Sequence, residues 1–303
     1  MKLGLVSAIL DGWDLKEMLY EAKNAGYKCV EVACWPGGAG ATRRYAGVCH
    51  IDVDNTTPEY IACVKGLLEE TGMSISSLAF YPNPLDPVSG PDAVAHLYKV
   101  IDMSAALGVG LVTTFIGRDQ TKTVEENLEL VKKVWPPILE HAKEKGVKVG
   151  IENCPMLFGA DQWPGGQNLF TSPRNWEKIF EALPYDNLGI NYDPSHFIWQ
   201  HIDYIKPIYK FKDKIFHVHI KDIKMYPDKL NEVGIMGYPL EFMSPKLPGY
   251  GDVDWGKYIS ALTDIGYNGP VCVEVEDKAF EDTKEHVVDS IVLSRKYMEQ
   301  FVI

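Results

Sequence analysis

One pattern repeats eight times along the 303-residue chain and restricts its fold more than any other feature. In each repeat, a short run of apolar or β-branched residues ends in polar residues and is followed by a stretch whose apolar positions lie three and four residues apart. The pattern predicts eight buried strands, each followed by an amphipathic helix. The expected strands are residues 2–7, 28–35, 73–80, 109–116, 147–153, 187–193, 215–222 and 270–276.

Glycines end several of the expected helices and leave only one or two residues before the next strand. They are Gly26, Gly72, Gly108, Gly146 and Gly266, and the helical stretches include 14–25, 58–71, 92–107, 123–145 and 174–183. Short returns from helix to strand are typical of a parallel sheet. Eight such units predict an α/β fold, a closed (β/α)8 barrel. An open doubly wound sheet is the alternative, but no GxGxxG motif follows the first strand.

The connections from strand to helix are long, whereas the returns are short. Four of them are 36–57, 81–91, 154–171 and 223–253, all rich in Gly, Pro, Trp and Tyr. In a parallel barrel the active site lies at the carboxyl ends of the strands, where these connections begin. No linker divides the chain, so we expect a single domain over residues 1–303 with elaborated loops on that face.

Composition excludes several classes of partner. The chain has 42 acidic and 30 basic residues, a net charge of −12, which would repel nucleic acid and anionic membranes. No apolar run reaches the ~20 residues that cross a bilayer, and the amino terminus has no signal-peptide pattern. The six cysteines form no CxxC pair, which disfavours disulfides and zinc-thiolate sites. We expect a cytoplasmic protein that acts on a small molecule. The sequence does not determine the oligomeric state, and a homo-oligomer is one possibility.

Four charged residues stand where successive expected strands turn polar. They are Glu152 in GIENCP, Asp193 in NYDPSH, His219 in HVHIKD and Glu274 in VEVED. Charged groups in buried runs are costly unless they are paired or bind a cation. Three carboxylates and one imidazole suit Mn²⁺, Mg²⁺ or Co²⁺. We expect these side chains to converge on one divalent cation; four separate ion pairs are the alternative.

These motifs resemble the xylose isomerase-like TIM barrels, often labelled sugar phosphate isomerases/epimerases. That family includes ketose 3-epimerases, inosose isomerases and dehydratases, and the endonuclease IV branch. The resemblance spans the whole chain and is most specific in GIENCP, NYDPSH, HVHIKD and GPVCVEVED. It implies that Glu152, Asp193, His219 and Glu274 hold one metal ion. Mn²⁺ is the expected cofactor, with Mg²⁺, Co²⁺ and Zn²⁺ as alternatives.

The resemblance also implies catalytic roles for Glu152 and Glu274. One glutamate would remove a proton beside a metal-polarised carbonyl to give an enediolate, and the other would return a proton from the opposite face. His196 matches a family histidine that contacts substrate oxygens. The expected function is a metal-dependent sugar isomerase or epimerase, with a keto sugar or keto-cyclitol as substrate.

Other residues bear on the substrate. Ketose 3-epimerases carry Arg six residues beyond the metal-binding His, where this chain has Met225, which disfavours a free ketose. Lys221 is expected to orient a substrate oxygen or, equally, to pair with the adjacent Asp222. Trp35 is expected to stack on a sugar ring or simply to pack, and His50 adds a donor near the mouth of the barrel.

A lyase on the same scaffold is the main alternative function. Proton abstraction leads to elimination when a leaving group occupies the β position, as in an inosose dehydratase or a 3-keto-glycoside-cleaving enzyme. The long connections 154–171 and 223–253 leave room for such a substrate.

Three other hypotheses are weaker. Adjacent Arg43 and Arg44 could grip a phosphate but are more typical of a solvated face. DNA repair by the endonuclease IV branch needs a three-metal site with many more histidine ligands and a basic surface, whereas this chain has eight histidines and a net charge of −12. A sugar-binding module would not require two carboxylates beside a metal.

Overall fold

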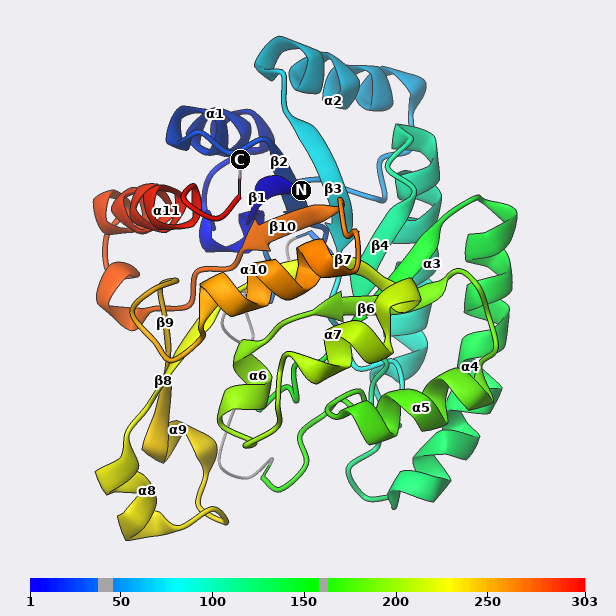
Figure 1. The fold of residues 1–303 in the computed structure, drawn as a ribbon. Coiled ribbons are helices and arrows are strands. Elements are labelled where there is room, and N and C mark those ends of the chain that lie inside the picture. The colour runs from blue at the N-terminus through cyan, green and yellow to red at the C-terminus, as the bar shows by residue number, and fades with distance from the viewer. Residues whose placement is uncertain (38–45, 158–162, 303) are drawn as a thin grey trace.

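Eight parallel strands close into a barrel surrounded by helices (Figure 1). The computed structural model describes residues 1–37, 46–157 and 163–302. Around the barrel the strands follow the order β1-β10-β7-β6-β5-β4-β3-β2. The predicted (β/α)8 barrel is therefore confirmed, and the open sheet is excluded. Arg43 and Arg44 lie outside the described residues.

The barrel strands all lie inside their predicted ranges. They are β1 (Lys2–Val6), β2 (Cys29–Ala33), β3 (Ser74–Ala79), β4 (Leu111–Thr114), β5 (Lys148–Glu152), β6 (Leu188–Tyr192), β7 (Ile215–Ile220) and β10 (Pro270–Val273). The helices that follow these strands are α1 (Leu15–Ala25), α2 (Pro58–Thr71), α3 (Gly90–Leu107), α4 (Val124–Glu144), α5 (Pro173–Ala182), α6 (Ser195–Ile198), α7 (Lys206–Lys210), α10 (Trp255–Asp264) and α11 (Lys284–Met298).

Local capping explains where several helices begin and end. Asp14 accepts a hydrogen bond from the backbone N–H of Glu17 at 2.8 Å and so begins α1. Gly26 ends the same helix with a φ of 95°, a left-handed conformation that glycine adopts without strain. The chain then turns directly into β2, which keeps the return short.

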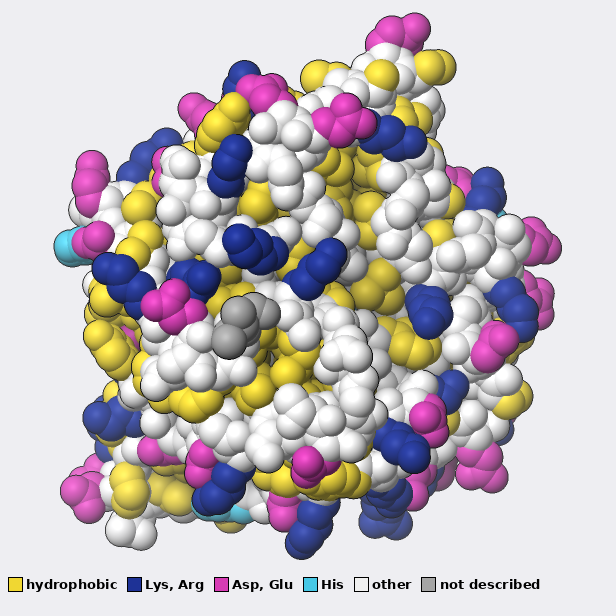
Figure 2. Space-filling view, turned by 45° about the horizontal axis from the view of Figure 1, so that its top comes forward, with side chains coloured by type: hydrophobic (Ala, Val, Ile, Leu, Met, Phe, Trp, Pro, Cys, Tyr) yellow, Lys and Arg dark blue, Asp and Glu magenta, His cyan; other side chains and the backbone are white. Residues whose placement is uncertain are grey.

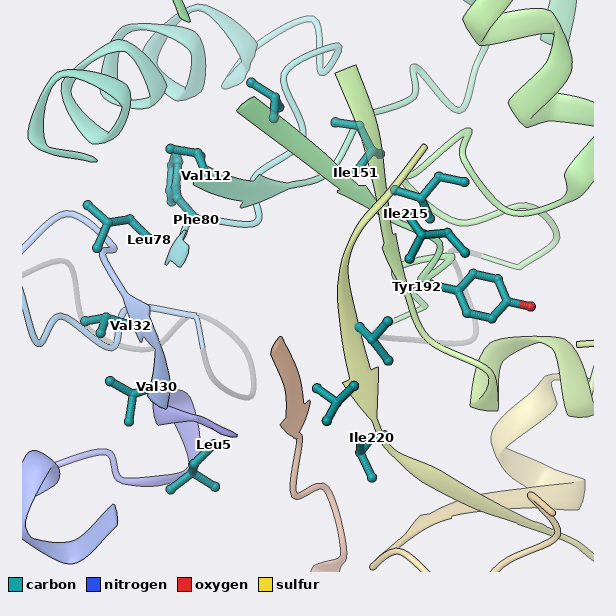
Figure 3. Close-up of a cluster of buried hydrophobic side chains, with 14 of the residues drawn as sticks. Leu5, Val30, Val32, Leu78, Phe80, Val112, Ile151, Tyr192, Ile215 and Ile220 are labelled. Atoms are coloured by element: carbon teal, nitrogen blue, oxygen red, sulfur yellow. The ribbon is translucent and has the colours of Figure 1, made fainter. Parts of the chain in front are cut away.

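Alternation along the strands separates apolar from polar side chains. Leu5, Val30, Leu78 and Val112 project from the strands toward the surrounding helices (Figure 3). Successive residues of a strand point to opposite faces, so the strand neighbours of these outward-pointing residues face the barrel interior. That interior contains a small apolar cluster of Val6, Cys29 and Cys272. It also contains fully buried polar side chains, namely Glu31, Ser77, Thr113, Asn191, His217 and His219.

The connection after β7 carries a small structured insertion, seen at the lower left of Figure 1. Strands β8 (Asp222–Met225) and β9 (Met243–Lys246) pair antiparallel, and α8 (Pro227–Val233) and α9 (Pro239–Phe242) lie between them. The long connection expected over 223–253 is present, and it contains strands and helices that the sequence analysis did not predict. These elements are too short to show a helical or strand period in the sequence.

The insertion has its own apolar cluster and a buried anchor. Trp199 of the barrel packs with Ile223, Phe242 and Met243 of the insertion. The Asp222 carboxylate accepts four hydrogen bonds at 2.8–3.1 Å. The donors are the backbone N–H groups of Ile223, Gly249 and Val253 and the indole N–H of Trp255. These donors, rather than Lys221, satisfy Asp222, so the structure does not support the expected pairing of the two.

The molecular surface mixes charges of both signs. Figure 2 shows one face on which Lys and Arg side chains are interspersed with Asp and Glu, with hydrophobic side chains visible between them. Among the described helices, none combines the length and the apolar character that a membrane span requires.

The hydrogen bonds of Asp222 lead to a prediction about the stability of the protein. Asp222→Ala leaves three buried N–H donors, and the more exposed one of Gly249, without their acceptor, so the free energy of unfolding should fall by about 3 kcal/mol or more. Urea denaturation followed by circular dichroism measures the change. Asp228→Ala, on the exposed side of α8, is the matched control and should stay within about 0.5 kcal/mol of wild type. Equal midpoints for the two variants would contradict the anchoring role.

Candidate metal centre

The four residues expected to bind metal come together at the carboxyl ends of their strands. Glu152 ends β5, Asp193 follows β6, His219 lies near the end of β7, and Glu274 follows β10. One ligand atom from each lies within 4.8 Å of those from the other three. The His219 Nδ1 atom is 3.3 Å from Glu274 Oε2 and 3.6 Å from Glu152 Oε1. The geometry is that of four ligands arranged around one point.

Hydrogen bonding shows that this group of residues fits a cation. Glu152 Oε1, Asp193 Oδ2, His219 Nδ1 and Glu274 Oε2 are all buried atoms without a hydrogen-bond partner among the described residues. A buried polar atom left in that state costs about 1–3 kcal/mol, more if it is charged. Four such atoms, one on each residue of a single cluster, are satisfied together by one divalent ion. Three oxygens and an imidazole nitrogen are a suitable donor set.

Glu31 orients the histidine of this cluster. Its Oε2 atom lies 3.1 Å from His219 Nε2; the ring tautomer that donates to Glu31 leaves the Nδ1 lone pair for a metal. Glu31 also accepts hydrogen bonds from Tyr81 Oη at 2.7 Å and Ser77 Oγ at 3.1 Å. Burial opposes ionisation of this carboxyl, but its donors outweigh burial and lower the pKa of Glu31 to about 2.

A second group of possible metal ligands has its donors and acceptors already in use. Glu31, His217 and His219 lie close together inside the barrel. However, His217 Nδ1 lies 3.0 Å from Asn191 Oδ1, and its Nε2 lies 3.0 Å from Ser76 Oγ. We therefore interpret this group as a hydrogen-bonded network beneath the metal centre.

Lys221 adds a positive charge to the centre. Its ammonium Nζ lies 2.8 Å from Glu274 Oε2 and 3.1 Å from Asp193 Oδ2, and the side chain is only 4% exposed. Burial by itself lowers the pKa of Lys221, but the surrounding carboxylates outweigh it and hold that pKa well above its usual value. The lysine therefore stays charged and neutralises part of the acidic cluster.

The two glutamates expected to be catalytic have different environments. Burial raises the pKa of Glu152, but the nearby His196, His219 and Lys221 outweigh it and lower that pKa to about 2. Burial also raises the pKa of Glu274, and here it prevails over the attraction of Lys221 and His219. With the site free of metal, Glu152 is thus the more acidic of the two carboxyl groups.

His196 lies beside two of the expected ligands. It belongs to α6, and its Nε2 atom is 3.2 Å from Asp193 Oδ2 and 3.6 Å from Glu152 Oε1. The ring is nearly buried, and Nε2 has no hydrogen-bond partner among the described residues. This placement suits the expected contact with a substrate oxygen next to the metal.

A cavity of about 80 Å³, open to solvent, leads to these residues. Glu152, Lys221, Glu274 and Glu276 form its charged side, and the other lining residues are Val6, Ala8, Ala33, Trp35, Ala46, Ala79, Tyr81, Phe115 and Cys154. Trp35 reaches the wall as expected and also packs edge-on against Phe80 at 5.0 Å. A charged side facing an apolar wall can hold a polar molecule with one apolar face.

His50 does not take the position expected from the sequence. Its Nδ1 atom lies 3.0 Å from Ser7 Oγ, and its Nε2 atom lies 3.1 Å from the Leu10 carbonyl oxygen. The side chain is buried and is not part of the cavity wall. Because both ring nitrogens hold the segment after β1, His50 is structural here rather than a substrate contact.

Three residues of the site were missed or left without a role by the sequence analysis. Glu31 could have been found as the one charged residue inside the apolar run of β2. Glu276 comes two residues after Glu274, beyond the end of β10, and its Oε2 atom lies 3.7 Å from Lys221 Nζ. Tyr81 follows β3 and has no distinguishing signal in the sequence.

Comparison with known proteins identifies the family of the chain. A family model described as xylose isomerase-like TIM barrel matches residues 19–297. A curated inosose dehydratase from Clostridium perfringens is 23% identical over 320 residues, which cover 99% of this chain and 97% of that protein.

Solved structures show the same fold. A D-allulose 3-epimerase from Methylomonas sp. superposes with a TM-score of 0.70 at 16% identity and covers 100% of this chain and 98% of its own. A probable 3-DHS dehydratase from Bacillus anthracis gives a TM-score of 0.71 at 14% identity and covers 99% of each chain. Since the family model spans most of the sequence, the chain belongs to the xylose isomerase-like TIM barrel family of sugar isomerases, epimerases and dehydratases.

Proposed function

We propose that the protein is a divalent-metal-dependent isomerase or epimerase whose substrate is a keto sugar or keto-cyclitol. The observation that carries this proposal is the set of four buried, unpartnered ligand atoms at the end of a cavity. The proposed partner is a small carbohydrate, without nucleic acid or membrane. Mn²⁺ is the proposed metal because the donors are mainly oxygen with one imidazole. Bound there, it would polarise the carbonyl and a neighbouring hydroxyl of the substrate.

In this proposal Glu152 and Glu274 handle the proton. Glu152 ends β5 and Glu274 follows β10, with β6 and β7 between these strands in the barrel, and both residues line the cavity. A base on one side removes the proton beside the carbonyl, and an acid on the other returns it, which inverts the carbon. Lys221 and His196 would orient the substrate oxygens.

A lyase is the second candidate, and a separate observation favours it. A second hollow of about 330 Å³ lies near the β5–α5 connection and the insertion. Its wall contains Trp163 and Trp199, whose rings meet edge-on at 6.0 Å, together with Ile235 and Met236. Such a wall suits an apolar ring on a larger substrate. Two relatives named as dehydratases fit elimination as well.

The first test of the proposal is metal content. Alanine substitution of Glu152, Asp193, His219 or Glu274 should each remove most of the bound Mn²⁺, because three ligands bind it less tightly and the centre loses charge. Plasma mass spectrometry of the dialysed variants gives the metal content. His286→Ala, an exposed residue of α11, should retain the metal. Near-stoichiometric metal in all four variants would disprove this centre.

The second test separates proton transfer from metal binding. Glu152→Gln and Glu274→Gln keep an oxygen ligand but cannot exchange a proton. A general acid or base contributes ~10²–10⁴ in rate, so the loss of kcat should persist at saturating Mn²⁺. Solvent deuterium uptake by the substrate, followed by NMR, measures the step. Near-normal rates after metal addition would show that the glutamates only hold the ion.

The third test concerns the substrate. Met225 ends β8 and packs with the cluster of the insertion, so it offers no donor to a flexible ketose. A ring-held keto sugar or keto-cyclitol arrives preorganised and needs fewer donors. We expect kcat/KM below ~10⁴ M⁻¹s⁻¹ on fructose, psicose and tagatose, which is the lower end for enzymes on their own substrates. Higher values would restore a ketose 3-epimerase. New olefinic signals from an inosose or a 3-keto-glycoside would identify the lyase.

A further inference from the structure

The ammonium group of Lys221 stands within the proposed metal centre. Its Nζ atom is 2.8 Å from Glu274 Oε2, 3.1 Å from Asp193 Oδ2 and 4.0 Å from Glu152 Oε1. All three oxygens belong to the atoms that lack a hydrogen-bond partner and would bind the metal. Oxygen ligands approach a divalent ion to about 2.0–2.6 Å, so the ion and the ammonium cannot share this space.

Glu276 provides an alternative carboxylate partner for the Lys221 ammonium. Its Oε2 atom is 3.7 Å from Lys221 Nζ, and its side chain is 22% exposed in the cavity wall. Glu276 comes two residues after Glu274, yet its carboxylate is not part of the four-ligand cluster. A change in the end of the lysine side chain is enough to bring Nζ onto this carboxylate.

The charge of the cluster favours keeping both the divalent ion and the Lys221 ammonium close to the carboxylates. Glu152, Asp193, Glu274 and Glu276 surround Lys221, and four carboxylates with one ammonium leave three negative charges. A divalent ion reduces this to one, provided that the lysine stays nearby. Buried charges that remain uncompensated are costly, so expelling Lys221 to solvent is unfavourable.

We propose that Lys221 and Glu276 form a cation-exchange pair. Without metal, the ammonium neutralises the ligand carboxylates; when metal enters, the ammonium moves onto Glu276. Glu276 is then a positioning residue that acts through Lys221. In the metal-bound state it directs the lysine toward the cavity, where Nζ donates to a substrate oxygen that gains negative charge. This inference rests on the proposed function and adds a purpose for Glu276.

Metal affinity tests the exchange without relying on turnover. The free Mn²⁺ signal in electron paramagnetic resonance gives Kd for wild type, Lys221→Met, Glu276→Gln and the double variant. Lys221→Met removes the competing cation and should bind Mn²⁺ about tenfold more tightly. Glu276→Gln removes the alternative place for the ammonium and should bind it about tenfold more weakly.

The double variant distinguishes this exchange from a simple effect of charge. If Glu276 acts through Lys221, Glu276→Gln changes Kd less than about threefold when residue 221 is Met. If Glu276 attracts the metal directly, the substitution weakens binding equally in both backgrounds, which overturns the proposal. Glu276→Asp should restore much of the wild-type affinity.

Controls keep the result interpretable. Lys257→Met removes an exposed lysine of α10 and should leave Kd unchanged, and circular dichroism verifies that each variant is folded. Unchanged or weaker Mn²⁺ binding by folded Lys221→Met refutes the exchange but leaves the metal centre standing. Absence of Mn²⁺ binding by wild type overturns both this inference and the proposed function.

Discussion

The cost of burying carboxylates without water is the constraint on which this structure depends. Glu152, Asp193 and Glu274 lie at the end of the barrel with side chains no more than 15% exposed. Like charges at such distances repel strongly when solvent is excluded. Lys221 compensates part of this charge, and one ligand atom on each of these residues makes no hydrogen bond among the described residues. The demand for a further positive charge is therefore built into the fold, and it links structure to chemistry.

The polar interior of the barrel supports this centre from below. A parallel barrel is usually filled by branched apolar side chains. Here Glu31, Ser77, His217 and Asn191 form hydrogen bonds across the interior instead. The network sets the ring orientation of His219 before any ligand arrives. Such preorganisation is what a site needs to stabilise developing charge.

Much of the fold and of the candidate site could be predicted from the sequence, because the alternation of residues in a strand and the polar residues at its end are local signals. Glu152 and Asp193 were identified by their position where an apolar run turns polar. Glu31 was missed because it lies within such a run, and its partner His219 is 188 residues away. His50 was misplaced because the path of its loop over Ser7 and Leu10 is set by tertiary packing, which leaves no periodic pattern. The short helices of the insertion were missed because each spans too few turns to show a period.

The position of the insertion in the chain has an evolutionary consequence. Lys221 belongs to the charged centre, and the very next residue, Asp222, ties the insertion to the barrel through its four hydrogen bonds. The boundary between the charged cluster and the insertion therefore falls at a single peptide bond. Segments of different length can be grafted after this bond while the carboxylates, the histidine and the lysine keep their places. The scaffold can thus change the shape of the second hollow without altering the charged cluster.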